Sequence, residues 1–153
     1  MRQKLGPERH NGIADTLVVV PAFNEQNNIV GVLREIQSSL PSADILVVND
    51  CSHDATAAFA RNFDGVCVID LPCNLGIGGA MQTGFKYALS KDYQYVVQVD
   101  GDGQHVPSEV GALFEKMQQE RCDMVIGSRF LGVDSFRTTW CRRLGIKVLY
   151  CLF

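Results

Sequence analysis

Two aspartates, Asp100 and Asp102, have the residue type and spacing that most directly suggest chemistry in this sequence. They stand in the stretch QVDGDGQH, where a run of apolar residues ends. Two carboxylates about 4 Å apart repel each other by roughly 4 kcal/mol at an effective dielectric constant of 20, so such a pair needs a proton or a cation. Oxygen ligands favour Mg²⁺ or Mn²⁺, which commonly bind through one or two carboxylates together with substrate phosphates. The pair therefore predicts a divalent metal site, and a plain chain reversal built from two Asp-Gly pairs stays open as the alternative.

The neighbours of the two aspartates fit either explanation. Gly101 and Gly103 allow the backbone to turn sharply, so that both carboxylates can point to one side. Gln104 and His105 follow directly and are candidates for a further ligand, or for a group that holds a ligand in place.

Alternating strand and helix patterns surround this motif and must position it. Short apolar runs predict five β-strands, at residues 16–20, 43–50, 65–70, 93–100 and 123–127. Helical patterns lie between and after them: from Ile29 to Leu40, from a cap at Ser52 or Asp54 to Arg61, over Ala80, Gly84 and Ala88 to about Leu89, from Pro107, and from about Thr139. This alternation predicts an α/β fold with a mostly parallel, Rossmann-like sheet and helices on both of its faces.

Polar residues follow each predicted strand. In parallel α/β sheets, ligands bind at the carboxyl ends of the strands. We therefore expect five loops to converge on one cleft, with these residues: Asn24 and Glu25, Asn49 and Asp50, Asn74 and Gly76, Asp100 and Asp102, Ser128 and Arg129.

Composition limits the remaining classes of protein. The chain has 153 residues, 46% of them hydrophobic and 20% charged, which predicts one globular domain with a sizeable core. A net charge of −3 gives no sign of nucleic-acid binding. Six cysteines without a CxxC pattern indicate reduced thiols in a cytoplasmic protein. Residues 1–15 form a polar tail without the apolar segment of a signal peptide, and no run is long enough to span a membrane.

The C-terminal stretch differs in charge from the rest. No acid follows Asp134, whereas four bases do. Apolar residues recur between these bases, so we expect residues 139–153 to begin an amphipathic helix that is truncated here. Such a helix would rest on a membrane through Leu144, Val148, Leu149 and Leu152, with anionic lipid heads meeting the bases; packing of these apolar residues on the core is the alternative.

Five sequence blocks together resemble a known family. VVVPAFNE, VVNDCSHDAT, NLGIGGAMQTG, VDGDGQH and GSRF, in this order and spacing, are similar to the family 2 glycosyltransferases of GT-A fold. Within that family the chain looks most like the dolichyl- or polyprenyl-phosphate mannosyl and glucosyl transferases. The resemblance covers residues 16 to about 147 and implies a GT-A catalytic domain at 16–138.

The resemblance implies a nucleotide-sugar site and a metal-dependent, inverting transfer. Asp50 would accept a hydrogen bond from the base, and Glu25 would accept from ribose hydroxyls; support of the following helix N-terminus is the alternative for Glu25. Asp100, Asp102 and Gln104 would bind Mg²⁺ or Mn²⁺, which would neutralise charge on the departing nucleoside diphosphate. The implied nucleotide-sugar site contains Pro21, Ala22, Asn24, Glu25, Asp50, Asn74, Gly76 and Asp100.

The resemblance also implies an acceptor, a polyprenyl or dolichyl phosphate or a growing cell-surface glycan, reached at the cytoplasmic face of a membrane. A phosphate acceptor is already an anion and attacks without a general base. Asp102 and Arg129 would be the catalytic residues, and Arg129, Arg142 and Arg143 would hold the acceptor phosphate. A strand-end ion pair for Arg129 and a solvated helix face for the other two arginines are the alternatives.

Two departures and one partial motif keep other functions open. Asn49 and Cys51 stand where the family pattern VVDDGS has Asp and Gly, which leaves open a degenerate, non-catalytic GT-A domain that binds a nucleotide-sugar or a partner protein. The block with Gly76 and Gly78 has Met81 where a dinucleotide-binding G-x-G-x-x-G needs its third glycine, so it predicts either backbone contact with a diphosphate or close helix packing. A sugar nucleotidyltransferase is disfavoured, because no phosphate loop follows the first strand.

Overall fold

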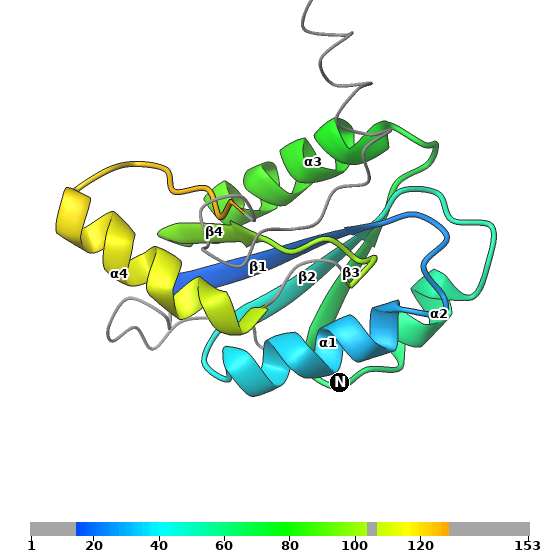
Figure 1. Ribbon diagram of the computed structural model, residues 1–153. Coiled ribbons are helices and arrows are strands. Elements are labelled where there is room, and N and C mark those ends of the chain that lie inside the picture. Colours follow the sequence, from blue (N-terminus) through cyan, green and yellow to red (C-terminus); the bar gives the residue numbers. More distant parts are fainter. Residues whose placement is uncertain (1–14, 104–106, 129–153) are drawn as a thin grey trace, which may run out of the picture. The chain divides into compact units, whose positions relative to one another are not determined.

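The computed structural model describes residues 15–103 and 107–128 (Figure 1). The chain divides into two compact units, Met1–Gly111 and Ala112–Phe153. The first unit contains the whole sheet and the helices that connect its strands.

Four parallel strands form the sheet of the first unit. Their order is β3-β2-β1-β4, with bounds β1 Thr16–Ala22, β2 Asp44–Asn49, β3 Val66–Asp70 and β4 Tyr95–Gln98. From β1 to β3 the chain moves outward one strand at a time, and it then returns to place β4 on the other side of β1. This reversal beside β1 creates a topological switch point, where ligands of open α/β sheets bind.

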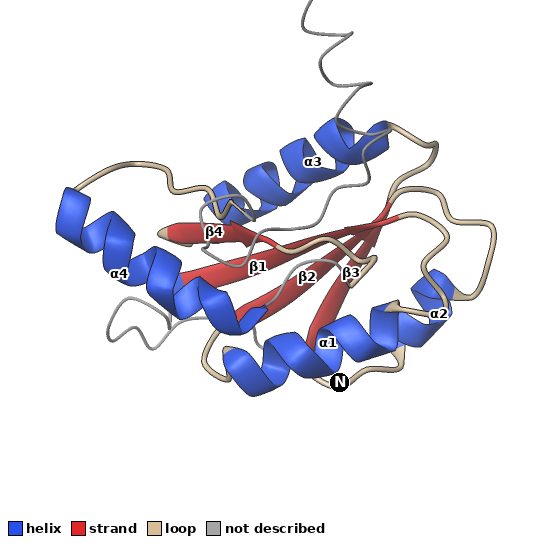
Figure 2. Ribbon diagram, viewed as in Figure 1, coloured by secondary structure: helices blue, strands red, loops and turns tan. Residues whose placement is uncertain are grey.

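Three helices cover the two faces of this sheet (Figure 2). The outward-moving connections contain α1 (Ile29–Ser39) and α2 (Thr56–Arg61), which lie on one face. The return connection contains α3 (Gly76–Ser90), which lies on the opposite face. The predicted α/β class, with a parallel sheet between two helical layers, is therefore confirmed.

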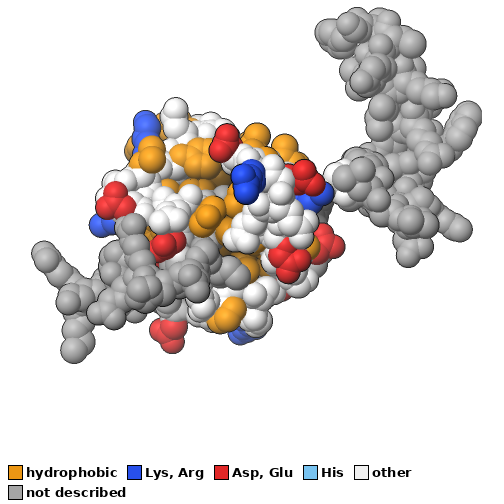
Figure 3. Space-filling model, turned by 90° about the vertical axis from the view of Figure 1, so that its left-hand side faces the viewer, with side chains coloured by type: hydrophobic (Ala, Val, Ile, Leu, Met, Phe, Trp, Pro, Cys, Tyr) orange, Lys and Arg blue, Asp and Glu red, His pale blue; other side chains and the backbone are white. Residues whose placement is uncertain are grey.

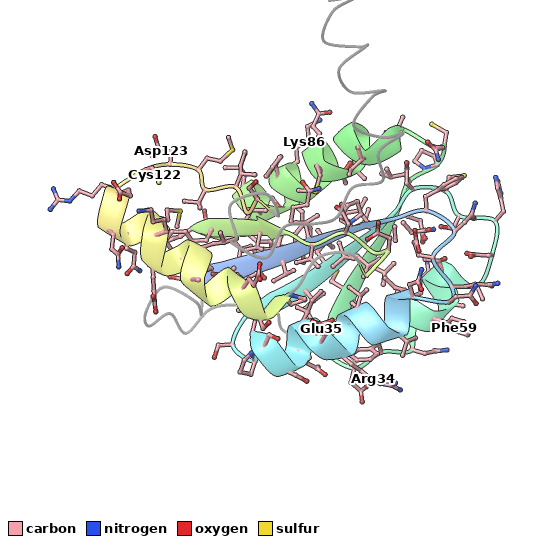
Figure 4. The ribbon with its side chains drawn as sticks, in the orientation of Figure 1. Arg34, Glu35, Phe59, Lys86, Cys122 and Asp123 are labelled. Carbon is pink, nitrogen blue, oxygen red and sulfur yellow. The ribbon has the colours of Figure 1, made fainter. Side chains whose placement is uncertain are left out.

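The alternation of side chains along β1 explains why both faces need helices. Leu17 and Val19 belong to the core cluster beneath α3, whereas the neighbouring Val18 and Val20 point to the other face and are also fully buried. On that other face, α1 presents the apolar stripe expected from the sequence: Ile29, Val32, Leu33 and Ile36. The labelled side chains Arg34, Phe59 and Lys86 come instead from the outer sides of α1, α2 and α3 (Figure 4).

A very close contact joins α3 to β1. A Cβ atom placed on Gly84 would lie 2.5 Å from Cγ1 of Val19 and 2.9 Å from its Cγ2. Only glycine lets the helix approach this strand so closely, and the flanking Ala80 and Ala88 are also buried. The small residues of this helix thus serve packing.

Another helix follows β4. Pro107–Glu109 form one 3₁₀ turn, which leads into α4, Val110–Glu120. The proline stands at a first helical turn, as its missing N–H and fixed φ predict. Near the helix end, Lys116 donates to Glu120 at 2.7 Å, an exposed i,i+4 pair.

The predicted fifth strand at 123–127 is wrong. These residues form a loop in the structure, in which Met124 is 72% exposed and Ile126 76% exposed. A short apolar run becomes a strand only when a neighbouring strand pairs with it, and no described residue pairs with this one. The other four predicted strands are confirmed, with their bounds adjusted by the pairing.

Several expectations lie outside the described residues. They are the structure of the N-terminal tail before Asp15, the possible metal ligand Gln104, the arginines Arg129, Arg142 and Arg143, and the helix expected from Thr139. Within the described part of the chain, no helix is both long and apolar enough to cross a membrane.

The face drawn in Figure 3 carries exposed hydrophobic side chains, with acidic and basic ones interspersed among them.

Candidate active site

An open cleft lies at the carboxyl ends of the strands, at the switch point beside β1. It has a volume of about 190 Å³. The end of β1, the residues after β1, β2 and β4, and the start of α3 line it: Pro21, Ala22, Phe23, Glu25, Asp50, Ile77, Ala80, Asp100, Gly101 and Asp102. The loops after β1, β2 and β3 gather on the right-hand side of Figure 1. Four of the five loops expected to converge thus contribute to one cleft or to its support.

The β1 loop is tied to the loop after β2 by backbone and side-chain hydrogen bonds. Asn24 adopts a left-handed conformation (φ 57°), and its Oδ1 accepts from the backbone N–H of His53 at 2.9 Å. The Asn24 N–H in turn donates to Oγ of Ser52 at 3.0 Å. Asn24 therefore joins two loops, and its side chain is not among the residues that line the cleft.

Glu25 lines the cleft and also starts the turn that leads into α1. Its carbonyl oxygen accepts from the N–H groups of Asn28 and Ile29, and its Oε2 accepts from Nδ2 of Asn28 at 2.8 Å. Its N–H donates to Oγ1 of Thr56 at 2.7 Å. The carboxylate is thus held at the edge of the cleft by the start of the following helix.

Asp54 fixes the start of α2 and the β1 loop at once. Its Oδ1 accepts from both the N–H and the hydroxyl of Thr56, and its Oδ2 accepts from the N–H of Gln26. Desolvation opposes the charged form, but the hydrogen bonds from Thr56 and Gln26 outweigh it and lower the pKa of Asp54. The N-cap of α2 is Ala55, which makes no side-chain cap hydrogen bond, so the expected cap at Ser52 or Asp54 is wrong. Asp54 instead accepts from the first N–H of the helix from one position before the cap.

Asp50 is buried and connects β2 to the start of α3. Its Oδ1 accepts from the N–H of Leu75 at 2.7 Å, and its own N–H donates to the carbonyl of Ala22 at 2.9 Å. The carboxylate still borders the cleft. The position of this acid is therefore set by three segments: the β1 end, the β2 end and the α3 start.

Asn49, one of the two departures from the family pattern, has a specific partner. Its Nδ2 donates to Oδ1 of Asp70 at 2.9 Å, and its Oδ1 accepts from the N–H of Ser52. The other carboxylate oxygen of Asp70 pairs with Arg61. An aspartate at position 49 would face Asp70 across adjacent strands, since the two positions pair in register. The amide is thus the residue that suits this neighbour.

Cys51, the other departure, keeps the backbone conformation of a glycine. Its φ is 62°, in the left-handed region that a side chain disfavours by roughly 1–2 kcal/mol. The loop thus retains the turn for which the family pattern has Gly, although the residue has changed.

The glycine-rich block serves two purposes. Asn74 Oδ1 accepts from the N–H of Gly76 at 3.0 Å, and Gly76 has a φ of 70°, so these residues shape the turn that begins α3. Neither lines the cleft, although both were expected in the nucleotide-sugar site. Ile77 and Ala80 from the same helix do line it.

Asp100 and Asp102 both border the cleft, on either side of Gly101. A Cβ atom on Gly101 would lie 3.2 Å from the carbonyl oxygen of Pro21 and 3.4 Å from Cβ of Ala22. Glycine therefore lets the β4 loop lie against the end of β1. Gly103 has a φ of 75°, in the left-handed region that favours glycine. Asp100 Oδ1 accepts from Nε2 of Gln98 at 2.9 Å.

The cleft is acidic. Among its described lining residues four are acids, Glu25, Asp50, Asp100 and Asp102, and none is Lys or Arg. No group of three or more His, Cys, Asp or Glu side chains within the described residues is arranged to hold a metal ion. The chain thus offers a cation two neighbouring carboxylates, with the remaining positions open to oxygens of water or a substrate, and this hard-oxygen donor set fits Mg²⁺ or Mn²⁺.

The profile of the family "Glycosyl transferase family 2" matches residues 17–148, most of the chain and all of the cleft. The chain belongs to glycosyltransferase family 2. This family 2 domain is 34% identical over 134 residues to a polyprenol monophosphomannose synthase of Mycolicibacterium smegmatis, a match over 84% of this chain and 50% of the relative. It is 33% identical to an undecaprenyl-phosphate mannosyltransferase of Micrococcus luteus, over 74% of this chain and 47% of the relative. The domain spans about half the length of these curated relatives.

Solved structures show the same fold. A Pyrobaculum calidifontis mannosyltransferase in complex with GDP-Man and Mn²⁺ matches with a TM-score of 0.53 and 20% identity, over 64% of this chain and 30% of that chain. S. aureus TarS matches with a TM-score of 0.56 and 23% identity, over 81% of this chain and 40% of that chain. The GT-A fold expected for the family 2 domain is confirmed.

Sequence reasoning missed three side chains of the family 2 domain's cleft, Phe23, Ile77 and Ala80, of which the first two are large. Phe23 is 43% exposed and packs edge-on against His53, with ring centroids 6.3 Å apart. Ile77 is 58% exposed. Both residues stand inside sequence blocks that carried the family resemblance. Their position in these blocks was the available signal that they could lie at the cleft. An exposed apolar side chain in a loop gives no periodic pattern from which its direction could be inferred.

Proposed function

We propose that this domain binds a nucleoside-diphosphate sugar together with a divalent cation and transfers the sugar, with inversion, to a polyprenyl or dolichyl phosphate. The observation that carries the proposal is the acidic cleft at the switch point, where four carboxylates and no described base surround a space suited to a ligand.

An anionic donor and an acidic cleft are compatible only if a cation lies between them. Two like unit charges 4 Å apart repel by about 4 kcal/mol at an effective dielectric constant of 20, and a diphosphate beside several carboxylates would meet this repulsion more than once. Asp100 and Asp102 are adjacent acids on the cleft wall and would hold the ion. When bound, Mg²⁺ or Mn²⁺ supplies Lewis-acid stabilisation of the departing nucleoside diphosphate. Gln104 would complete the protein ligands.

The other acids suit the nucleoside half of the donor. Asp50 Oδ1 is occupied by the Leu75 N–H, so Oδ2 is the atom assigned to the base. Glu25 stands at the β1 edge, where its carboxylate would accept from ribose hydroxyls. Pro21 and Ala22 contribute apolar surface to the same cleft.

The acceptor assignment is supported by the relatives' names, which specify polyprenol and undecaprenyl phosphates. A phosphate attacks as an anion, and its charge would be held by Arg129, with Arg142 and Arg143. Because such acceptors are lipids, the reaction would take place at a membrane surface. A cell-surface glycan acceptor is the alternative, and it would additionally need a general base to accept the hydroxyl proton.

A second candidate function is a domain that binds the nucleotide sugar without turnover. The observation that favours it is Asn49, whose amide is committed to Asp70 and Ser52 and so lacks the role of the aspartate in the family pattern.

Calorimetric titration with UDP, GDP and dTDP, each with Mn²⁺, with Mg²⁺ and with a chelator, tests the donor site. We expect one nucleotide to bind only with metal, and Asp102→Asn to weaken that binding at least about tenfold, because one anionic ligand is lost. Glu35→Gln is the matched control, since Glu35 is an exposed acid of α1 outside the cleft. Equal binding with chelator, or by Asp102→Asn, would remove the metal from the proposal.

Turnover separates the two candidate functions. Release of nucleoside diphosphate that depends on added polyprenyl phosphate supports the transferase. Metal-dependent nucleotide binding without such release, under any acceptor, supports the non-catalytic domain.

A further inference from the structure

Two neighbouring loops beside Asp50 each carry one cysteine. The loop after β2 contains Cys51, and the loop after β3 contains Cys73. The strands before them are adjacent and parallel, and Asn49 pairs in register with Asp70. Neighbouring strands lie about 4.8 Å apart, within the range of Cα separations that a disulfide spans. Cys51 lies two residues after Asn49, and Cys73 lies three residues after Asp70.

Hydrogen bonds keep the two loops together beyond the strand ends. The Leu71 N–H donates to the Asn49 carbonyl at 2.9 Å, and the Leu75 N–H donates to Asp50 Oδ1 at 2.7 Å. In the loop after β3, Cys73 lies between the two donors, Leu71 and Leu75. In the loop after β2, Cys51 directly follows the two acceptors, Asn49 and Asp50. The loops therefore cannot separate at the cysteines without breaking these bonds.

The Cys51 side chain contacts the residue that precedes the other cysteine. Its Sγ lies 4.0 Å from the carbonyl oxygen of Pro72, and the carbon of that carbonyl is bonded to the nitrogen of Cys73. Cys73 is exposed, so its side chain can change rotamer without displacing core atoms. Both thiols are free in the structure, and Cys51 is half-buried.

The other described cysteines are placed differently. Cys67 packs against the core cluster and lies 3.8 Å from the Tyr87 hydroxyl. Cys122 follows α4, in the second unit. Of the four described cysteines, only Cys51 and Cys73 belong to loops that are hydrogen-bonded to each other beside the cleft.

We propose that Cys51 and Cys73 form a reversible disulfide that joins the two loops next to Asp50. A thiolate of the pair attacks glutathione disulfide, which forms a mixed disulfide and releases one glutathione. The other cysteine then attacks the mixed disulfide and releases the second glutathione, so that two cysteine thiols are oxidised while one glutathione disulfide is reduced. The cross-link holds the loop that positions Asp50 and limits its movement away from α3.

The test equilibrates the purified chain in glutathione buffers from reducing to oxidising and traps free thiols by alkylation. Cleavage after Lys and Arg places Cys51 in peptide 35–61 and Cys73 in peptide 62–86, so the bond appears as one cross-linked mass that dithiothreitol abolishes. Peptide 62–86 also contains Cys67, so Cys67→Ala must keep the cross-link and Cys73→Ser must lose it.

Stability supplies an independent measurement. The bond closes a loop of about 20 residues, which by the chain-entropy relation raises Tm by about 7–14 °C in a chain of this size. We expect that rise on oxidation in the unaltered chain and in Cys67→Ala, but not in Cys73→Ser. Both thiols remaining alkylatable in oxidising buffer, or a cross-link of either cysteine to Cys67, Cys122, Cys141 or Cys151, would overturn the proposal. Neither measurement uses a nucleotide, so the result is independent of the proposed transferase activity.

Discussion

Replacing Gly84 with alanine would drive a methyl group into Val19, at the point where α3 lies closest to β1. The added Cβ would lie 2.5 and 2.9 Å from the two Cγ atoms of Val19, whose side chain is fully buried. Overpacking of this kind costs about 1–3 kcal/mol. Alanine is favoured over glycine inside a helix by roughly 0.5–1 kcal/mol, which offsets part of the cost. We therefore expect Gly84→Ala to lower the free energy of unfolding by about 1–2 kcal/mol.

Urea unfolding of a double-mutant cycle measures this clash separately. Val19→Ala removes both Cγ atoms and leaves only a Cβ, 3.3 Å from the position of the added methyl group. In that background Gly84→Ala should become neutral or slightly stabilising, which gives a coupling free energy of about 2 kcal/mol between the two positions. Gly78→Ala is the matched control, because it lies in the same helix with nothing within 4 Å of the added Cβ. It should stabilise by roughly 0.5–1 kcal/mol.

The reasoning fails if Gly84→Ala is neutral in the unaltered chain, or if its cost is the same with and without the Val19 methyl groups. A neutral result would mean that α3 moves away from β1 at little cost, and an unchanged cost would mean that the destabilisation does not come from contact with Val19. A shifted α3 would also carry Leu75 away from Asp50, so nucleotide binding is a useful second measurement in these variants.

Two further predictions concern polar pairs. Asn49→Asp should destabilise the chain by about 1–3 kcal/mol, since it replaces the donor to Asp70 with a second carboxylate. Adding Asp70→Asn should restore most of the loss. Urea unfolding of both variants checks this, and equal stability of Asn49→Asp and the unaltered chain would contradict it. Burial and the hydrogen bond to Asp44 raise the pKa of Tyr93, so this pair stabilises the fold below about pH 10 and its contribution is lost as the pH rises further. Between pH 8 and about pH 11, the free energy of unfolding measured in urea should therefore fall more steeply for the unaltered chain than for Tyr93→Phe. Parallel curves would refute the assignment.

The sheet was predictable wherever strands are buried on both faces. Residues 17–20 and 45–48 are continuous apolar runs, and both became parts of central strands. The run at 123–127 is similar in composition, but a strand also needs a pairing neighbour, which no local pattern supplies. The same limit explains why the predicted strand at 93–100 extends beyond β4, since pairing with β1 covers only Tyr95–Gln98.

The site was predictable to the level of loops, and less so for single side chains. Glu25, Asp50, Asp100 and Asp102 all border the cleft, as expected from their places after strands. Asn24 was expected there too, but it bonds to the next loop. Short polar side chains in turns can satisfy backbone groups as readily as a ligand, and sequence does not indicate which they choose.

By itself, the sequence determined the alternation of strands and helices, the family and the acidic loops after the strands, because periodicity and block order are properties of the chain alone. Only the tertiary structure decided the strand order, which places Asp100 and Asp102 beside the end of β1 and pairs Asn49 with Asp70. These arrangements depend on the direction in which each connection crosses the sheet and on contacts between residues roughly 20 to 80 positions apart. No local pattern encodes such contacts, since each one exists only after the strands have paired.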